Sequence, residues 1–217
     1  MSATVEHGRL MDSVYRHQRH VYDATRKYYL LGRDPMIEGL RPGDGANVLE
    51  IGCGTGRNLI KAARLYPQAK FHGVDISSEM LATAAKSVSA SGLQGRIRLA
   101  YADAASFDPA KAFQRRDFDR IFISYAVSMI PAWRQIMQEA MAHLSPGGEL
   151  HIVDFGDQSG LPKLFKSALY KYLSWYHVTP RASLFETSAG IAAGGDAVTE
   201  EKRLYRGFAW ISIIRRS

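Results

Sequence analysis

The order of apolar and polar stretches along the 217 residues predicts an α/β fold in which helices cover both faces of a parallel sheet. Short apolar runs that are typical of buried strands alternate with longer stretches of helical character. The last two runs lie within residues 200–216 and are separated at Gly207, which is typical of an antiparallel hairpin. We therefore expect a mostly parallel sheet that ends in an antiparallel pair.

The elements follow in order from the amino end. Aromatic and basic side chains over residues 15–31 favour a helix that ends at Gly32, with Asp34 and Pro35 as a stop signal beyond it. Ser77 is a good N-cap for a later helix that runs through Ser89, and residues 145–148 predict a turn. Further helices are expected over 58–66 and 131–143, and strands over 47–51, 70–75, 97–101, 118–124 and 149–155.

Composition limits the class of protein. Hydrophobic residues make up 46% and charged residues 23%, which is the balance of a globular chain and excludes disorder. The single cysteine, Cys53, excludes a disulfide framework and a cysteine-based zinc cluster, and the scattered histidines predict no metal site. There is no apolar run of membrane-spanning length and no apolar core of a secretory signal near the amino end, so a cytoplasmic protein is expected.

The net charge of +7 indicates an acidic partner, which is a nucleic acid, an anionic membrane surface or an acidic ligand. Residues 162–176 predict an amphipathic helix with lysines on the side opposite to its apolar residues. Such a helix is suited to a membrane interface, although its apolar face is equally suited to packing against the sheet. The apolar residues are Leu164, Phe165, Leu169, Tyr172, Leu173 and Tyr176.

The first strand runs directly into a glycine-rich turn, Glu-Ile-Gly-Cys-Gly-Thr-Gly over residues 50–56. Glycines let the backbone bend sharply and approach a ligand closely. The dinucleotide fingerprint would need its third glycine where Arg57 stands, so the spacing favours a nucleoside ligand without a pyrophosphate. The alternative is a glycine-rich turn without a ligand.

Polar side chains follow the next strands at the same edge of the sheet. Asp75 ends the second strand, where a carboxylate can accept hydrogen bonds from both hydroxyls of a ribose. Asp103 follows the third strand and is expected at the amino group of an adenine, while Ser124 and Tyr125 end the fourth strand at the ligand-binding crevice. The alternative roles of the two aspartates are a helix cap and a loop cap.

Together these motifs and the terminal hairpin resemble class I S-adenosylmethionine-dependent methyltransferases, and the resemblance covers residues 43–216. It implies a Rossmann-like, seven-stranded sheet in the order 3-2-1-4-5-7-6 with strand 7 antiparallel, and S-adenosyl-L-methionine as cofactor. Arg33 is expected at the methionine carboxylate. The cofactor-binding residues expected in this way are Tyr28, Arg33, Glu50, Gly52, Cys53, Gly54, Gly56, Asn58, Asp75, Ile76, Met80, Asp103, Ala104, Ser124 and Tyr125.

Residues 15–34 resemble the bacterial enzymes that N-methylate diacylglyceryl-homoserine to the betaine lipid diacylglyceryl-trimethylhomoserine. These enzymes are similar to bacterial phosphatidylethanolamine N-methyltransferases, which are the alternative. The resemblance implies three successive methylations and a single methyltransferase domain, with residues 1–42 as a helical lid and 43–217 as the catalytic core. It also implies a peripheral position at the inner face of the membrane and a functional link to the enzyme that makes diacylglyceryl-homoserine.

Methyl transfer to an amine requires a free lone pair, so an ammonium must first lose a proton. Tyr22, Tyr29 and Asp154 are the expected catalytic residues, through proton removal or through contact with the cationic amine. Their alternative roles are packing of an aromatic helix and capping of a loop. Methylation of RNA or of a soluble small molecule is a further alternative, although the Ser-Tyr-Ala-Val sequence at residues 124–127 lacks the motif usual in nucleobase methyltransferases, so no nucleic acid partner is expected.

Overall fold

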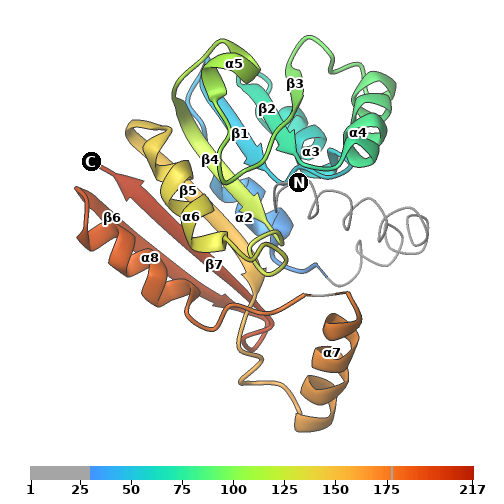
Figure 1. Cartoon of the computed structure of the whole chain (residues 1–217), viewed down its shortest axis with the longest axis vertical. Helices are drawn as coiled ribbons and strands as arrows, with labels where there is room; N and C mark the ends of the chain where they lie inside the picture. The colour runs from blue at the N-terminus through green and yellow to red at the C-terminus, as the bar shows by residue number, and fades with distance from the viewer. Residues whose placement is uncertain (1–29, 177) are drawn as a thin grey trace, which may run out of the picture.

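The computed structural model describes residues 30–176 and 178–217, and the strands predicted from apolar runs are all present in it. They are β1 (Asn47–Ile51), β2 (Lys70–Asp75), β3 (Ile97–Tyr101), β4 (Phe118–Ser124) and β5 (Leu144–Phe155), followed by the hairpin strands β6 (Ala197–Leu204) and β7 (Ala209–Arg216). The sheet has the order β3-β2-β1-β4-β5-β7-β6, and β7 runs antiparallel to β5 (Figure 1). The expected fold class is therefore confirmed.

The central strand β1 is buried along its whole length, because both faces of the sheet are covered by helices. Ile51, its last residue, pairs with Val74 of β2 on one side and with Ile123 of β4 on the other. The carboxyl ends of three neighbouring parallel strands therefore meet at one edge, where open α/β sheets bind their ligands.

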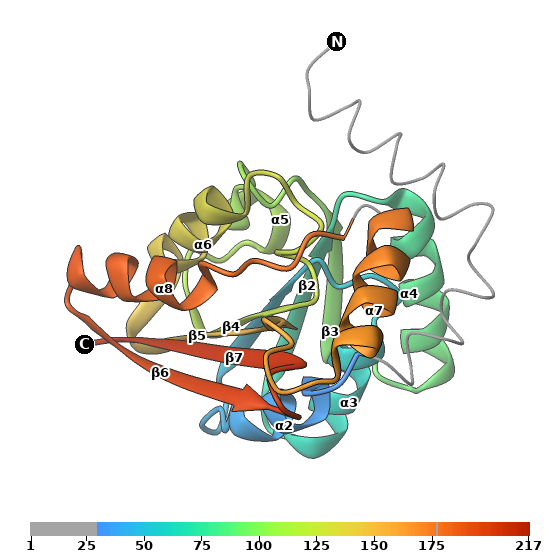
Figure 2. The same cartoon turned by 90° about the horizontal axis from the view of Figure 1, so that it is seen from below.

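Seven described helices surround the sheet. On one face, α2 (Arg33–Gly39), α3 (Arg57–Leu65) and α4 (Ser78–Ala90) bury their apolar residues; α5 (Pro109–Phe113), α6 (Trp133–Ala142) and α8 (Leu184–Ala193) cover the other face (Figure 2). Helix α7 (Lys163–Trp175) stands out from the carboxyl edge of the sheet (Figure 1).

Asp34 and Pro35, which were expected beyond the end of a helix, lie in the first turn of one. Arg33, Asp34 and Pro35 form the first turn of α2, which sequence reasoning missed. Proline is tolerated there because the backbone N–H groups of a first helical turn have no partner within the helix. The expected helix over residues 15–31 lies outside the described residues, apart from Leu30 and Leu31.

The predicted turn at residues 145–148 is a bulge inside β5. Leu144 pairs with Phe118, and the next paired residue, Glu149, lies opposite Arg120. Four residues of β5 therefore stand against the single residue Asp119, and Gly147 has a φ of 71° that suits glycine. The short helix α5 and the helix α8 were also not predicted.

The amphipathic helix is confirmed as α7, but its apolar residues divide between two surroundings. Leu173 is buried, and Leu169, Tyr172 and Tyr176 pack against the core. Leu164 is 87% exposed and Phe165 is 50% exposed, so the amino-terminal part of the apolar face does not pack against the sheet. None of the described helices has the length and apolar character that crossing a bilayer requires.

Gly73 in β2 is the point at which the sheet requires the smallest side chain. A Cβ atom there would lie 2.5 Å from Leu59 Cδ1 of α3 and 2.9 Å from Cys53 Sγ of the glycine-rich turn. We expect Gly73→Ala to lower the free energy of unfolding by about 1–3 kcal/mol through overpacking, measured by urea denaturation. Gly190→Ala in the exposed middle of α8, where a Cβ meets no described atom within 4 Å, is the control and should be neutral or stabilising. Equal losses in the two variants would contradict this packing.

Candidate functional site

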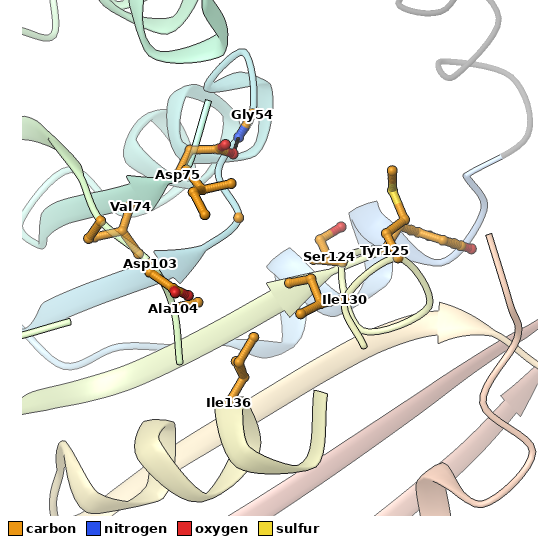
Figure 3. Close-up of a pocket in the computed structure, with 14 residues that line it drawn as sticks. Gly54, Val74, Asp75, Asp103, Ala104, Ser124, Tyr125, Ile130 and Ile136 are labelled. Atoms are coloured by element: carbon orange, nitrogen blue, oxygen red, sulfur yellow. Dashed lines mark hydrogen bonds between the residues drawn. The ribbon is translucent and has the colours of Figure 1, made fainter. Parts of the chain in front are cut away.

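The glycine-rich turn after β1 folds back onto the end of β2. Gly52 N and Cys53 N both donate to Val74 O, at 2.9 Å and 3.0 Å. Gly54 N donates to Asp75 Oδ2 at 2.7 Å (Figure 3), and the other carboxylate oxygen, Oδ1, accepts from Ser77 N at 2.9 Å. The Asp75 carboxylate therefore joins the turn to the start of α4 and keeps both segments at the edge of the cavity.

Two glycines of the turn need their backbone freedom for different reasons. Gly52 has a φ of 73°, and a Cβ on it would lie 3.0 Å from Ala126 Cβ. Gly54 has a φ of 52°, and a Cβ there would meet no described atom within 4 Å. Gly52 is thus required by packing, whereas Gly54 presents bare backbone to open space beside Asp75.

The first cavity lies between the ends of β2, β3 and β4 and has a volume of about 90 Å³. Its walls are largely apolar: Val74 lies on the β2 side, and Ile130 and Ile136 lie across from it, in and after the β4–α6 loop (Figure 3). Asp75 and Asp103 add carboxylates, and Asp103 Oδ1 accepts from Ala105 N at 3.0 Å. A narrow apolar slot with a few polar groups suits a flat heterocycle with polar edges.

The second cavity, of about 380 Å³, shares Gly52, Gly54 and Ser124 with the first and is more polar. Glu50 contributes to its lining and is only 1% exposed. Glu50 Oε1 accepts from Asn58 Nδ2 at 2.8 Å, and Oε2 has no hydrogen-bond partner within the described part of the chain. Burial raises the pKa of the Glu50 carboxyl to about 8, and the nearby Asp75 carboxylate adds to this effect.

The guanidinium of Arg33 lines the same cavity, where its Nε donates to Leu30 O at 3.1 Å. One cavity therefore contains a cation and a buried carboxyl group with an unpaired oxygen. This pair complements the carboxylate and the ammonium of an amino acid. Joined to the apolar slot across Gly52 and Gly54, the two cavities fit the parts of S-adenosylmethionine: a nucleoside in the first and a methionine in the second.

Most of the predicted cofactor residues line one of the two cavities. These are Arg33, Glu50, Gly52, Cys53, Gly54, Asn58, Asp75, Ile76, Asp103, Ala104, Ser124 and Tyr125. Gly56 lies outside the lining, because it turns the chain into α3 with its Cα close to Ala84 of α4. Met80 is 2% exposed and packs against Met129 and Tyr176. Tyr22, Tyr28 and Tyr29 fall outside the described residues.

Asp154 is fully buried and lines neither cavity, so the structure does not bring this predicted catalytic residue to the site. Its Oδ2 accepts from Ser128 N at 3.0 Å and its Oδ1 from Phe155 N at 2.7 Å. Burial raises the pKa of the carboxyl to about 6. The side chain supports the β4–α6 loop from beneath, and that is the role its contacts define.

The β4–α6 loop, residues 125–132, contains site residues that sequence reasoning missed. Met129 and Ile130 line the first cavity, and Arg181 holds the loop from outside. Arg181 Nε donates to Val127 O at 2.9 Å and Nη2 to Ile130 O at 3.0 Å. These residues follow no motif; the available signal was their position after a strand that ends at the binding edge.

Tyr125 begins this loop with a φ of 53°, which is uncommon for a bulky residue. Its hydroxyl donates to Leu31 O, so the loop is also tied to the segment just before α2. Within residues 30–176 and 178–217, no three His, Cys, Asp or Glu side chains gather closely enough to hold a metal ion.

Comparisons with known proteins find similarity to methyltransferases. Residues 48–148 match the family model of a methyltransferase domain. Over 150 residues the chain is 26% identical to a demethylmenaquinone methyltransferase of Listeria monocytogenes, and the match covers 68% of this chain and 61% of that protein. The chain therefore spans less than two thirds of the length of this relative.

Solved structures share the fold. An O-methyltransferase family protein from Burkholderia thailandensis superimposes with a TM-score of 0.71 at 20% identity, covering 94% of this chain and 61% of that one. A phosphoethanolamine N-methyltransferase from Haemonchus contortus, in complex with S-adenosyl-L-methionine, gives 0.64 at 19% identity, covering 85% and 52%. At these identities the likeness establishes the fold.

The raised pKa of Glu50 makes stability depend on pH. In the unfolded chain the carboxyl ionises from about pH 4.5, whereas in the folded protein it keeps its proton up to about pH 8. The free energy of unfolding should therefore fall as the pH rises through this window. We expect Glu50→Gln to flatten that fall and to stabilise the protein at pH 7 by up to about 3 kcal/mol, measured by urea denaturation at several pH values. The exposed Glu201→Gln is the control, and parallel profiles for Glu50→Gln and the wild type would contradict the assignment.

Proposed function

We propose that this chain, which contains a class I S-adenosylmethionine-dependent methyltransferase domain, transfers methyl groups to the amine of a lipid headgroup at a membrane surface. The acceptor that we favour is diacylglyceryl-homoserine, methylated three times to diacylglyceryl-trimethylhomoserine. The carrying observation is an exposed apolar and basic stripe on α7, a helix that is followed by Tyr176, which packs against Met80 as the cavity-lining Met129 also does. The resemblance of residues 15–34 to betaine-lipid N-methyltransferases supports the choice of lipid.

When bound, S-adenosylmethionine supplies a methyl group that is already activated by the positive charge of its sulfur. The chain then has to bind and orient the reactants, since proximity and orientation are the main contributions a protein makes to such a transfer. Asp75 suits the ribose hydroxyls, and its bond to Gly54 fixes the carboxylate in place. Arg33 and Glu50 suit the methionine carboxylate and ammonium. The apolar residues Ile130 and Ile136 keep water from the nucleoside compartment.

The stripe on α7 consists of Leu164, Ala168, Lys171 and Trp175. These residues recur at intervals of three or four positions, so they share one side of the helix. All four are exposed, Leu164 by 87% and Trp175 by 68%. A basic helix with exposed leucine and tryptophan is suited to the boundary between lipid headgroups and acyl chains, where lysine pairs with anionic lipid.

The stripe adjoins the methyl-transfer site through the other side of α7. Tyr176, the residue after the helix, packs with Met80 and Met129, and Met129 lines the nucleoside cavity. A lipid held under α7 would therefore have its headgroup near the cofactor site. This supports a peripheral enzyme of the inner membrane face, working next to the enzyme that makes diacylglyceryl-homoserine.

Each methylation consumes the lone pair of the acceptor nitrogen, so an ammonium headgroup must release one proton before every transfer. Tyr22 and Tyr29 remain our predicted partners of the acceptor amine, and both lie outside the described residues.

Incubation with methyl-labelled S-adenosylmethionine and a total lipid extract tests the substrate class. Label on diacylglyceryl-homoserine derivatives is expected. Label on phosphatidylethanolamine derivatives would favour the alternative lipid, and label on RNA or soluble molecules alone would overturn the lipid assignment.

The cofactor assignment predicts a loss of affinity at Asp75. Asp75→Asn removes the charge from the hydrogen bonds to the ribose and should weaken S-adenosylmethionine binding by about 1.5–3 kcal/mol, which is roughly ten- to a hundredfold. Isothermal titration calorimetry measures this directly. Asp44→Asn, an exposed aspartate before β1, is the matched control. Wild-type affinity in Asp75→Asn would show that the ribose lies elsewhere.

The lipid assignment predicts that α7 governs membrane binding without affecting the cofactor. We expect Leu164→Glu with Trp175→Glu to abolish most binding to vesicles of phosphatidylglycerol and to reduce activity on lipid, since each buried large apolar side chain contributes roughly 1.5–3 kcal/mol. Binding should also fall with salt, because surface attraction is screened over about 8 Å at physiological ionic strength. Leu65→Glu, at the exposed end of α3, is the control. If the α7 double variant and Leu65→Glu bind vesicles equally well, α7 does not contact the membrane.

A further inference from the structure

A separate cavity of about 240 Å³ lies at the opposite edge of the sheet from the cofactor site. Lys70, the first residue of β2, lines it, whereas Asp75, the last residue of that strand, lines the nucleoside cavity. Among the described residues, the two cofactor cavities and this one have no lining residue in common. We call it the basic cavity. Its lining residues belong to none of the sequence motifs and have no role in the proposed methyl transfer.

The lining of the basic cavity carries positive charge from three segments of the chain. Side chains alternate along a strand, so Lys70 and His72 share one face of β2, and Arg98 of β3 pairs in register with His72. Arg115 follows α5 and lines the cavity from outside the sheet. Of the described lining residues none is an aspartate or a glutamate. This concentration of cations creates a field that attracts anions.

Arg96 also lines the cavity, but its guanidinium is committed elsewhere. Its Nη1 donates to Pro67 O at 2.9 Å and to Tyr66 O at 3.2 Å, and its Nη2 donates to Ala63 O. These carbonyls lie at and just after the end of α3. Arg96 therefore caps the end of α3. The cations that remain for a ligand are Lys70, Arg98 and Arg115, and Nη1 of Arg115 also donates to Asp117 O at 3.3 Å.

His72 provides a second, independent indication of a ligand. The side chain is 5% exposed, and its Nδ1 has no hydrogen-bond partner in the described part of the chain. Its other nitrogen, Nε2, lies 3.4 Å from Asn47 Oδ1. Burial, followed by the charges of Arg115, Arg98 and Lys70, lowers the pKa of His72 to about 4, so the ring is neutral at pH 7. In the neutral ring the one proton is on Nε2, which faces the amide oxygen of Asn47, so Nδ1 is an acceptor. Buried polar atoms are nearly always hydrogen-bonded, and a hydroxyl group in the cavity would satisfy Nδ1.

We propose that the basic cavity binds the phosphate group of a small ligand. A phosphate offers several charged acceptor oxygens, which the three cations would surround, and its protonated oxygen can donate to Nδ1 of His72. The volume exceeds that needed by the phosphate alone, so the group is bound either free, as a phosphate anion, or as an ester such as a lipid headgroup. The site is remote from methyl transfer, and the inference does not depend on the proposed function.

The test uses the full chain with histidine side chains labelled for NMR and two probes. Inorganic phosphate represents the free anion, and sn-glycerol 3-phosphate represents a headgroup ester. We expect either probe to shift the His72 ring resonances in a saturable manner. Tighter binding of inorganic phosphate would identify the free anion as the source, and tighter binding of the ester would identify a headgroup.

Matched variants assign the binding to this cavity. Arg98→Gln and Arg115→Gln should each lower the affinity for the probe by about tenfold or more, because each removes a charge-assisted contact. Arg116→Gln changes the same charge in the neighbouring, exposed residue that lies outside the lining, and should bind as the wild type does. All three should bind S-adenosylmethionine with unchanged affinity, which separates this result from the cofactor assignment.

Two outcomes would overturn the proposal. One is the absence of a saturable His72 shift in the wild-type protein with both probes. The other is an equal effect of Arg115→Gln and Arg116→Gln, which would indicate unspecific charge attraction. Arg115 is partly exposed and Arg116 is exposed, so neither substitution should unfold the protein. The test therefore does not need a variant of the buried His72.

Discussion

The carboxylate of Asp75 is the constraint on which the cofactor site depends. Its two oxygens accept main-chain N–H groups from Gly54 and Ser77, and so join the turn after β1 to the helix after β2. The paired donors Gly52 N and Cys53 N on Val74 O complete the attachment. A turn with three left-handed glycines has many alternative conformations, and these few bonds select the one that leaves Gly54 bare towards the ligand.

The opposite wall of the site is held by a different kind of interaction. The β4–α6 loop lies between two charged side chains, Asp154 beneath it and Arg181 outside it, and both bind its main chain. The loop contributes apolar side chains to the nucleoside cavity while its polar backbone is satisfied by these two groups. Arg181 follows α7 in the chain, so it connects the proposed membrane helix to the wall of the nucleoside cavity. Its position therefore affects the shape of the cavity, although Arg181 is not a predicted site residue.

The sequence was sufficient for the sheet and for the glycine-rich turn, because both depend on local patterns. Apolar runs identified the buried strands, and the spacing of Gly52, Gly54 and Asp75 predicted a ligand close to the backbone at that edge of the sheet. The helix that begins at Arg33 was missed, because a proline is compatible both with the end of one helix and with the first turn of the next. Asp154 was expected in the site because it ends a strand, yet its side chain points into the core and bonds the loop. The basic cavity could not be predicted, because Lys70, Arg98 and Arg115 come together only through strand register.

The hydroxyl of Tyr125 donates to the carbonyl of Leu31, at the point where the described chain enters beside the cofactor cavities. Force applied to the chain at Leu31 would therefore act on Tyr125, the residue that starts the wall of the nucleoside cavity. The other end of the chain behaves differently. β7 runs away from the binding edge, and Arg216 donates to Leu144 O at the far side of the sheet (Figure 1). Surface immobilisation and single-molecule handles are therefore best placed after β7, where force enters the sheet without crossing the site.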